Sequence, residues 1–219
     1  MVLRFSPCYN EVNTNWGVFQ MTSEQLLANN RVVPVVVIRD IADACPTLEA
    51  LRDGGIPVAE ITFRTACAAE AIRIGCEKYP DMMIGAGTVV NAEQAKTALA
   101  AGARFIVSPG LSAGVAEVCR EAGVPYLPGC VTPTEIMAAL EMGLTTLKFF
   151  PANVYGGLTA LKALSAPFPQ VRFLPTGGVD LKNIKEYLAF DKVAAVGGSF
   201  MMKGDIRANC KQLLEVLNA

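Results

Sequence analysis

Short apolar runs alternate with segments of helical periodicity along most of the chain. The apolar runs are rich in valine, isoleucine and phenylalanine, which is typical of buried strands. They begin near Val32, Pro57, Met82, Arg104, Pro125, Thr146, Arg172 and Val193. The segments between them predict helices over residues 41–52, 66–78, 91–100, 112–121, 133–141, 158–164 and 183–189, with a last helix near 208–217.

Four of these helical segments are followed by a glycine just before the next strand, at Gly55, Gly102, Gly123 and Gly143. Glycine at this place is a signal of a helix C-terminus. Strand and helix alternate eight times, so the sequence predicts an α/β fold, a single (β/α)8 TIM barrel. A doubly wound open sheet is the alternative, but no Gly-x-Gly-x-x-Gly turn follows the first strand.

The N-terminal residues do not share this alternation. They contain Trp16, the only tryptophan, and lack the basic start and apolar core of a secretory signal. Met21 resembles a second start, and the residues after it predict an N-capped helix. We therefore divide the chain into a leader of unknown role, residues 1–21, and a barrel domain, residues 22–219.

The amino-acid composition argues against several classes of binding partner. The formal net charge is −1, so no basic field is available for nucleic acid or an anionic membrane. No stretch approaches 18 apolar residues, which argues against a membrane span. The seven cysteines form no Cys-x-x-Cys pair, and we interpret them as reduced packing thiols of a cytoplasmic protein.

The chain contains no histidine. This excludes Ser-His-Asp and Cys-His chemistry and removes the commonest metal ligand. Proton transfer must then be carried out by a carboxylate, a lysine, a tyrosine or water.

Lys148 interrupts an apolar run, residues 145–151, that is predicted to be a buried strand. A free lysine has a pKa of about 10.4, and lowering it to roughly 7 takes about 4–5 kcal/mol of environmental bias. A lysine held neutral in this way is a nucleophile that can form a Schiff base with a carbonyl. The alternatives are a lysine that reaches out to solvent and one that forms a structural ion pair.

Period-two alternation indicates which side chains of the second and sixth strands share a face. If Leu147 and Phe149 face the helices, Lys148 points into the barrel. On the second strand, Glu60 and Arg64 share one face. An inward glutamate and an inward lysine are expected to meet, either as a functional pair or as a structural one.

Glycine-rich turns close several of the predicted strands. Gly-Gly pairs follow the seventh and eighth strands, at 177–178 and 197–198. Backbone N–H groups at these two strand ends are typical of a barrel phosphate site. Gly85 and Gly87 end the third strand, where small residues would let a ligand approach the backbone and Thr88 would supply a hydroxyl.

These motifs together resemble the class I aldolases that cleave 2-keto-3-deoxy-6-phosphogluconate (KDPG), a family that also includes 4-hydroxy-2-oxoglutarate (KHG) aldolase. The segments that carry the resemblance are VAEITFRT at 58–65, GAGTV at 85–89, SPG at 108–110, LKFFPA at 147–152, PTGG at 175–178 and GGS at 197–199. The similarity runs from about Thr22 to the C-terminus and departs only in the leader and at residues 200–203.

The resemblance implies a (β/α)8 barrel, usually a homotrimer, that needs neither a metal nor an organic cofactor. It implies that Lys148 forms the Schiff base and that Glu60 is the general acid/base. The other implied site residues are Arg64 and Thr88 for the pyruvate carboxylate, Pro109 and Phe150 for the pocket wall, and Thr176, Gly177, Gly178, Gly198 and Ser199 for the sugar-phosphate end. The implied substrate is a keto-acid sugar phosphate.

Other functions stay open on the same scaffold. The substrate can instead be the galactonate epimer of KDPG, or unphosphorylated KHG. A phosphosugar isomerase or decarboxylase would use Lys148 only electrostatically, and a non-catalytic binder would need no nucleophile. Neither of these last two would form a covalent adduct.

Overall fold

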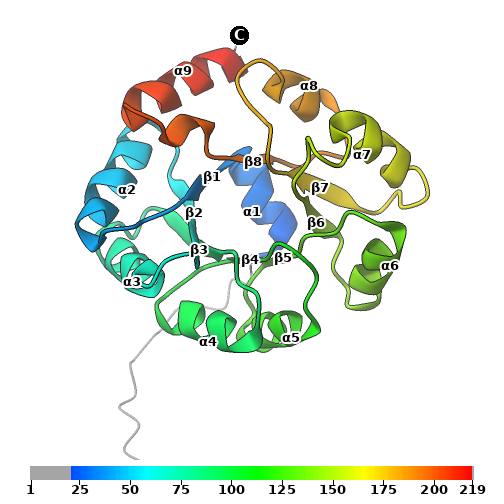
Figure 1. Cartoon of the computed structure of the whole chain (residues 1–219), viewed down its shortest axis with the longest axis horizontal. Coiled ribbons are helices and arrows are strands. Elements are labelled where there is room, and N and C mark those ends of the chain that lie inside the picture. Colours follow the sequence, from blue (N-terminus) through cyan, green and yellow to red (C-terminus); the bar gives the residue numbers. More distant parts are fainter. Residues whose placement is uncertain (1–20, 219) are drawn as a thin grey trace, which may run out of the picture.

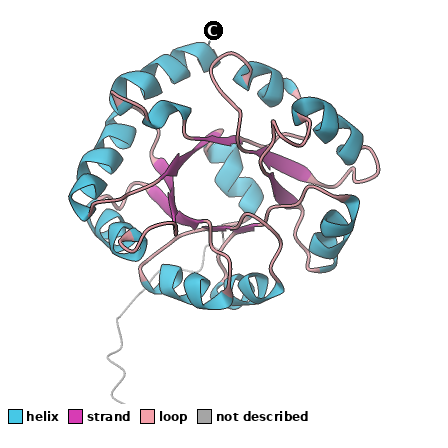
Figure 2. Cartoon of the chain, in the orientation of Figure 1, coloured by secondary structure: helices cyan, strands magenta, loops and turns pink. Residues whose placement is uncertain are grey.

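The computed structural model describes residues 21–218, and within them eight parallel strands form a ring that is surrounded by helices (Figure 2). The strands are β1 (Val32–Val36), β2 (Val58–Thr62), β3 (Met83–Gly87), β4 (Ile106–Val107), β5 (Tyr126–Leu127), β6 (Thr146–Phe149), β7 (Arg172–Pro175) and β8 (Val196–Gly198). The helices are α1 (Ser23–Asn29), α2 (Ala44–Asp53), α3 (Ala68–Lys78), α4 (Ala92–Ala100), α5 (Ala113–Ala122), α6 (Pro133–Glu141), α7 (Gly157–Ser165), α8 (Ile184–Ala189) and α9 (Ile206–Asn218), with 3-10 turns η1 (Ile41–Asp43) and η2 (Phe200–Met202).

The strands close into a barrel in sequence order. Six of them hydrogen-bond in the order β5-β4-β3-β2-β1-β8, and β6 pairs with β7. Three bridges join these sheets. Gly129, after β5, pairs with Lys148 of β6. Phe173 of β7 pairs with Val193, and Thr176 pairs with Gly197 of β8. The predicted single (β/α)8 barrel is confirmed.

Most predicted elements are found within a few residues of their expected positions. The predicted helix over 41–52 is an exception in detail, because it begins as η1 and continues as α2. The predicted leader lies outside the described residues apart from Met21, so the division into leader and barrel domain stays a prediction. None of the helices in residues 21–218 combines the length and apolar character that a membrane span requires.

Helix α1 lies across one opening of the barrel (Figure 1). Its predicted N-cap is present, because the Thr22 hydroxyl accepts a hydrogen bond from the Gln25 N–H in a capping box. Leu26 and Leu27 are fully buried. The Ser23 hydroxyl donates to the carbonyl of Tyr126, at the start of β5. Helix α1 therefore closes the end of the barrel where the strands begin, and the other end is left for chemistry.

The four predicted helix-ending glycines share one geometry. Gly143 has φ of 76° and follows α6. Its N–H donates to the carbonyl of Leu140, and the next N–H, of Leu144, donates to the carbonyl of Ala139. This pair of bonds is a Schellman motif, which satisfies carbonyls that the end of the helix leaves free.

Replacing Gly143 tests how much this turn depends on left-handed backbone. Gly143→Ala should lower the free energy of unfolding by about 1–2 kcal/mol, because a Cβ opposes the left-handed conformation. No heavy atom lies within 4 Å of the added Cβ, so packing does not contribute. Urea denaturation measures the change.

Gly114, the second residue of α5, is the matched control. The Cβ of Gly114→Ala would meet only the Ala92 Cβ, at 3.6 Å, which is ordinary contact. This variant should be more stable by roughly 0.5 kcal/mol, because alanine favours helix. A shift of both variants in the same direction would contradict the backbone explanation.

Candidate active site

Lys148 and Glu60 meet inside the barrel. Lys148 Nζ lies 3.1 Å from Glu60 Oε1 and 3.3 Å from Oε2. Lys148 is 5% exposed and Glu60 is 1% exposed, so the pair is shielded from bulk water. The predicted inward direction of both side chains is confirmed.

The strand pattern explains why Lys148 points inward. Its neighbours Leu147 and Phe149 are fully buried on the opposite face. The Phe149 ring packs edge-on against Phe173, with 6.4 Å between ring centroids. Because side chains alternate along a strand, the burial of these two neighbours on the outer face turns Lys148 into the barrel. The Phe150 ring then lies 5.4 Å from Lys148 Nζ, close enough for a cation–π contact.

Arg64 and Thr88 form a second polar pair, beyond the ends of β2 and β3. Arg64 Nε donates to Thr88 Oγ1 at 3.0 Å. Thr88 has φ of 56°, an uncommon left-handed conformation for a threonine. The structure brings together these two predicted residues, and the exposed Arg64 keeps guanidinium donors for an anion.

Pro109 lies in a loop that Tyr126 holds in place. The Tyr126 hydroxyl lies 2.6 Å from Ser108 Oγ and accepts a hydrogen bond from the Ser112 N–H at 3.3 Å. Burial raises the pKa of Tyr126 to about 12, with the hydrogen bond to Ser108 opposing the shift, so this hydroxyl stays protonated at neutral pH. A Cβ at Gly129 would collide with the Pro109 carbonyl, so the loop also packs closely on the chain after β5.

The sequence did not reveal Tyr126 as a supporting residue. A tyrosine at the start of a predicted strand carries no motif, and its hydroxyl reaches the loop only through the pairing of β4 with β5.

The turns after β7 and β8 lie side by side, joined by the bridge between Thr176 and Gly197. A Cβ at Gly197 would collide with Thr176 Oγ1, so this glycine makes room for the threonine. Gly198 is buried beyond this bridge, and Ser199 is exposed next to it.

The turn after β7 has a free backbone donor. Within the described residues, no hydrogen bond takes the N–H group of Gly178, whereas the N–H group of Gly177 faces β8 in the bridge between Thr176 and Gly197. Asn183 Nδ2 donates to the Gly178 carbonyl at 2.9 Å, and Asn183 Oδ1 accepts from the Asp180 N–H. Asn183 therefore fixes the turn, and the turn can bind an anion through its free N–H group.

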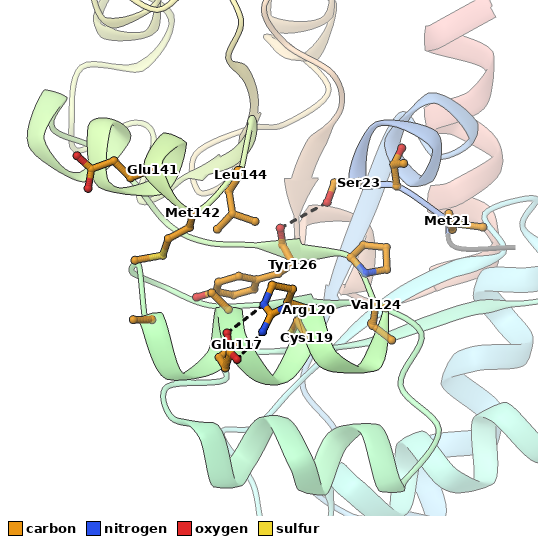
Figure 3. A pocket seen from close by; sticks show the side chains of 16 residues that line it. Met21, Ser23, Glu117, Cys119, Arg120, Val124, Tyr126, Glu141, Met142 and Leu144 are labelled. Carbon is orange, nitrogen blue, oxygen red and sulfur yellow. Dashed lines mark hydrogen bonds and ion pairs between the residues drawn. The ribbon is translucent and has the colours of Figure 1, made fainter. Parts of the chain in front are cut away.

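A hollow of about 690 Å³ lies at the opposite end of the barrel, beside α5 and α6 (Figure 3). Tyr126, Met142 and the ion pair between Glu117 and Arg120 line it, and none of the predicted site residues does. Its position near the start of α1 separates it from the Lys148–Glu60 pair.

The described cysteines are free thiols, and those that are buried fit the predicted packing role. Burial raises the pKa of Cys119 and of Cys130 to about 12, which suppresses the reactive thiolate. Among residues 21–218, no three His, Cys, Asp or Glu side chains gather as a metal site would need. Cys8 lies outside the described residues.

The sequence profile described as KDPG and KHG aldolase matches residues 23–216. The chain belongs to this aldolase family. The 2-dehydro-3-deoxy-phosphogluconate aldolase of Treponema pallidum is 47% identical over 182 residues, which cover 83% of this chain and 87% of that protein. The enzyme of the same name from Dickeya dadantii is 44% identical over 191 residues, covering 87% and 88%.

One solved structure of a relative contains a covalent reaction intermediate. The KDPG aldolase from Legionella pneumophila, with pyruvate captured as a carbinolamine, is 42% identical and superposes with a TM-score of 0.81. The match covers 88% of this chain and 95% of that one. The aldolase family therefore includes carbon–carbon lyases that bond covalently to pyruvate.

Removing the Tyr126 hydroxyl should loosen the Pro109 loop. Tyr126→Phe is expected to lower the free energy of unfolding by about 1–2 kcal/mol, because buried polar groups of the loop lose their partner. Amide hydrogen exchange should become faster in residues 108–112.

Tyr79→Phe is the matched control. Tyr79 makes a hydrogen bond to the Cys45 carbonyl, away from this loop, and its loss should leave exchange in residues 108–112 unchanged. Unchanged loop exchange in Tyr126→Phe would show that the hydroxyl does not hold the loop.

Proposed function

We propose that this protein is a class I aldolase that cleaves KDPG to pyruvate and glyceraldehyde 3-phosphate. The observation that carries the proposal is the buried contact between Lys148 and Glu60 in a barrel of the aldolase family. A buried amine with a carboxylate 3.1 Å away has a nucleophile and a proton acceptor in one place.

Lys148 is the proposed Schiff-base residue. The Glu60 carboxylate can accept the ammonium proton of Lys148, which frees the amine to attack the C2 ketone. Glu60 then returns this proton to the hydroxyl at C2, which leaves as water and gives an iminium that draws electrons from the C3–C4 bond. Glu60, directly or through a water, takes the proton of the C4 hydroxyl as this bond breaks. The products are glyceraldehyde 3-phosphate and an enamine, which is protonated and hydrolysed to pyruvate.

The pyruvate end is assigned to the second polar pair. Arg64 and Thr88 bind the carboxylate of the keto acid, so the adjacent ketone faces Lys148. Pro109 and Phe150 line the pocket. Phe150 suits this role because its ring lies beside Lys148 Nζ.

The phosphate end is assigned to Thr176, Gly177, Gly178, Gly198 and Ser199. The free N–H group of Gly178 supports this assignment, because backbone donors bind phosphate without a charged side chain. The bridge between Thr176 and Gly197 brings the turn after β8 to the same place.

We also propose that the enzyme is a homotrimer of the cytoplasm. Met137, Val154 and Tyr155 are more than half exposed, and large exposed apolar side chains favour association. The free thiols suit a reducing compartment.

Covalent trapping tests the central step. Borohydride with pyruvate should add mass at the peptide that contains Lys148 and inactivate the enzyme, because reduction makes the Schiff base permanent. Lys148→Met should show no added mass and should lose turnover, whereas EDTA should leave wild-type activity intact. A Lys148→Met enzyme with full turnover would exclude the Schiff-base mechanism, and a wild type that is never trapped would favour a phosphosugar isomerase, decarboxylase or binder.

Relative turnover tests the substrate. We expect kcat/KM to be higher for KDPG than for unphosphorylated KHG, because the Gly177–Gly178 turn interacts only with the phosphate. The galactonate epimer tests recognition at C4 in the same assay. A preference for KHG would remove the proposed role of that turn, and a preference for the epimer would change the substrate without changing the chemistry.

A further inference from the structure

Gly87 stands beside the catalytic pair at the end of β3. It pairs in register with Thr62, two residues beyond Glu60 on β2. A Cβ added at Gly87 would collide with Glu60 Oε1 and Cγ, and would lie 2.6 Å from Cδ. The Glu60 side chain therefore fills the space that any other residue at position 87 would occupy.

The sequence predicted a different reason for this glycine, namely close approach of a ligand to the backbone. The structure instead places a catalytic side chain there. Gly87 does not have a left-handed φ, so its backbone conformation is open to alanine. The missing Cβ is what the site requires.

We propose that Gly87 is a positioning residue, whose missing side chain forms the slot that holds the Glu60 carboxylate against Lys148. The inference rests on the aldolase mechanism proposed above, in which Glu60 moves the protons. It assigns to Gly87 no contact with substrate. Its effect acts through the position of one carboxylate.

Gly85 supplies the comparison within the same strand. It also faces a space filled by another residue, but the Cβ of a substituted Gly85 would meet the Phe105 ring, with the nearest ring carbons at 2.5 Å. Phe105 is fully buried and carries no polar group for the reaction. The two glycines thus impose a similar steric limit, one on packing and the other on the carboxylate.

The first test compares Gly87→Ala with Gly85→Ala. Gly87→Ala should lower kcat by about 100-fold with little change in KM, because a displacement of about 1 Å at a reacting group has an effect of this size. Borohydride should still trap pyruvate on Gly87→Ala, since Lys148 is intact. Gly85→Ala should lower the melting temperature but keep most of the wild-type kcat.

A double mutant separates positioning from general damage. Glu60→Ala removes the Cγ, Cδ and Oε1 atoms that the added Cβ would meet, so adding Gly87→Ala to Glu60→Ala should leave the residual kcat and the melting temperature largely unchanged from those of Glu60→Ala alone. This comparison also holds if the Gly87→Ala single variant fails to fold. Losses that multiply in the double mutant would overturn the inference.

Two further outcomes would also overturn it: full turnover in Gly87→Ala, and an equal loss of kcat in Gly85→Ala. Both are read against the wild type in the same assay. If borohydride with pyruvate does not trap the wild type, the proposed aldolase mechanism is wrong. The trapping experiment on the wild type therefore distinguishes a failure of that mechanism from a failure of the proposal for Gly87.

Discussion

The contact between Lys148 and Glu60 is the constraint around which the barrel interior is arranged. Two opposite charges in a dry interior are costly unless they meet with good geometry, and packed apolar residues would stabilise the same space better. The chain nevertheless places one of them on β2 and the other on β6 and lets them span the barrel. Such an arrangement is explained by chemistry more readily than by stability.

The two ends of the barrel have different roles: one is closed by packing and the other carries the polar residues. Helix α1 covers the end where strands begin, with leucines buried beneath it. At the other end, the loops that follow β2, β3, β4, β7 and β8 carry the polar residues of the proposed site. In this fold the N-terminal ends of the strands usually contribute stability, and the loops at their C-terminal ends carry the reactive residues.

The sequence predicted those features of the fold that follow a regular pattern along the chain. Alternation along β2 and β6 gave the inward direction of Glu60 and Lys148, and the glycine signals gave the ends of four helices. The pattern did not predict which side chain fills a given space inside the ring. The contact of Glu60 with Gly87, and the support of the Pro109 loop by Tyr126, depend on how neighbouring strands are staggered. Spacing along one chain does not contain that information, because it arises between strands.

The free N–H group of Gly178 has a consequence for the range of molecules that the barrel can accommodate. An arginine or lysine enclosed there would be left as an uncompensated cation whenever a shorter molecule failed to reach it. Amide dipoles carry no net charge and can be solvated by water when nothing else is bound. A main-chain donor therefore leaves no uncompensated charge when nothing is bound to it, so the Lys148–Glu60 pair that we propose for catalysis can serve compounds that differ at the end remote from Lys148.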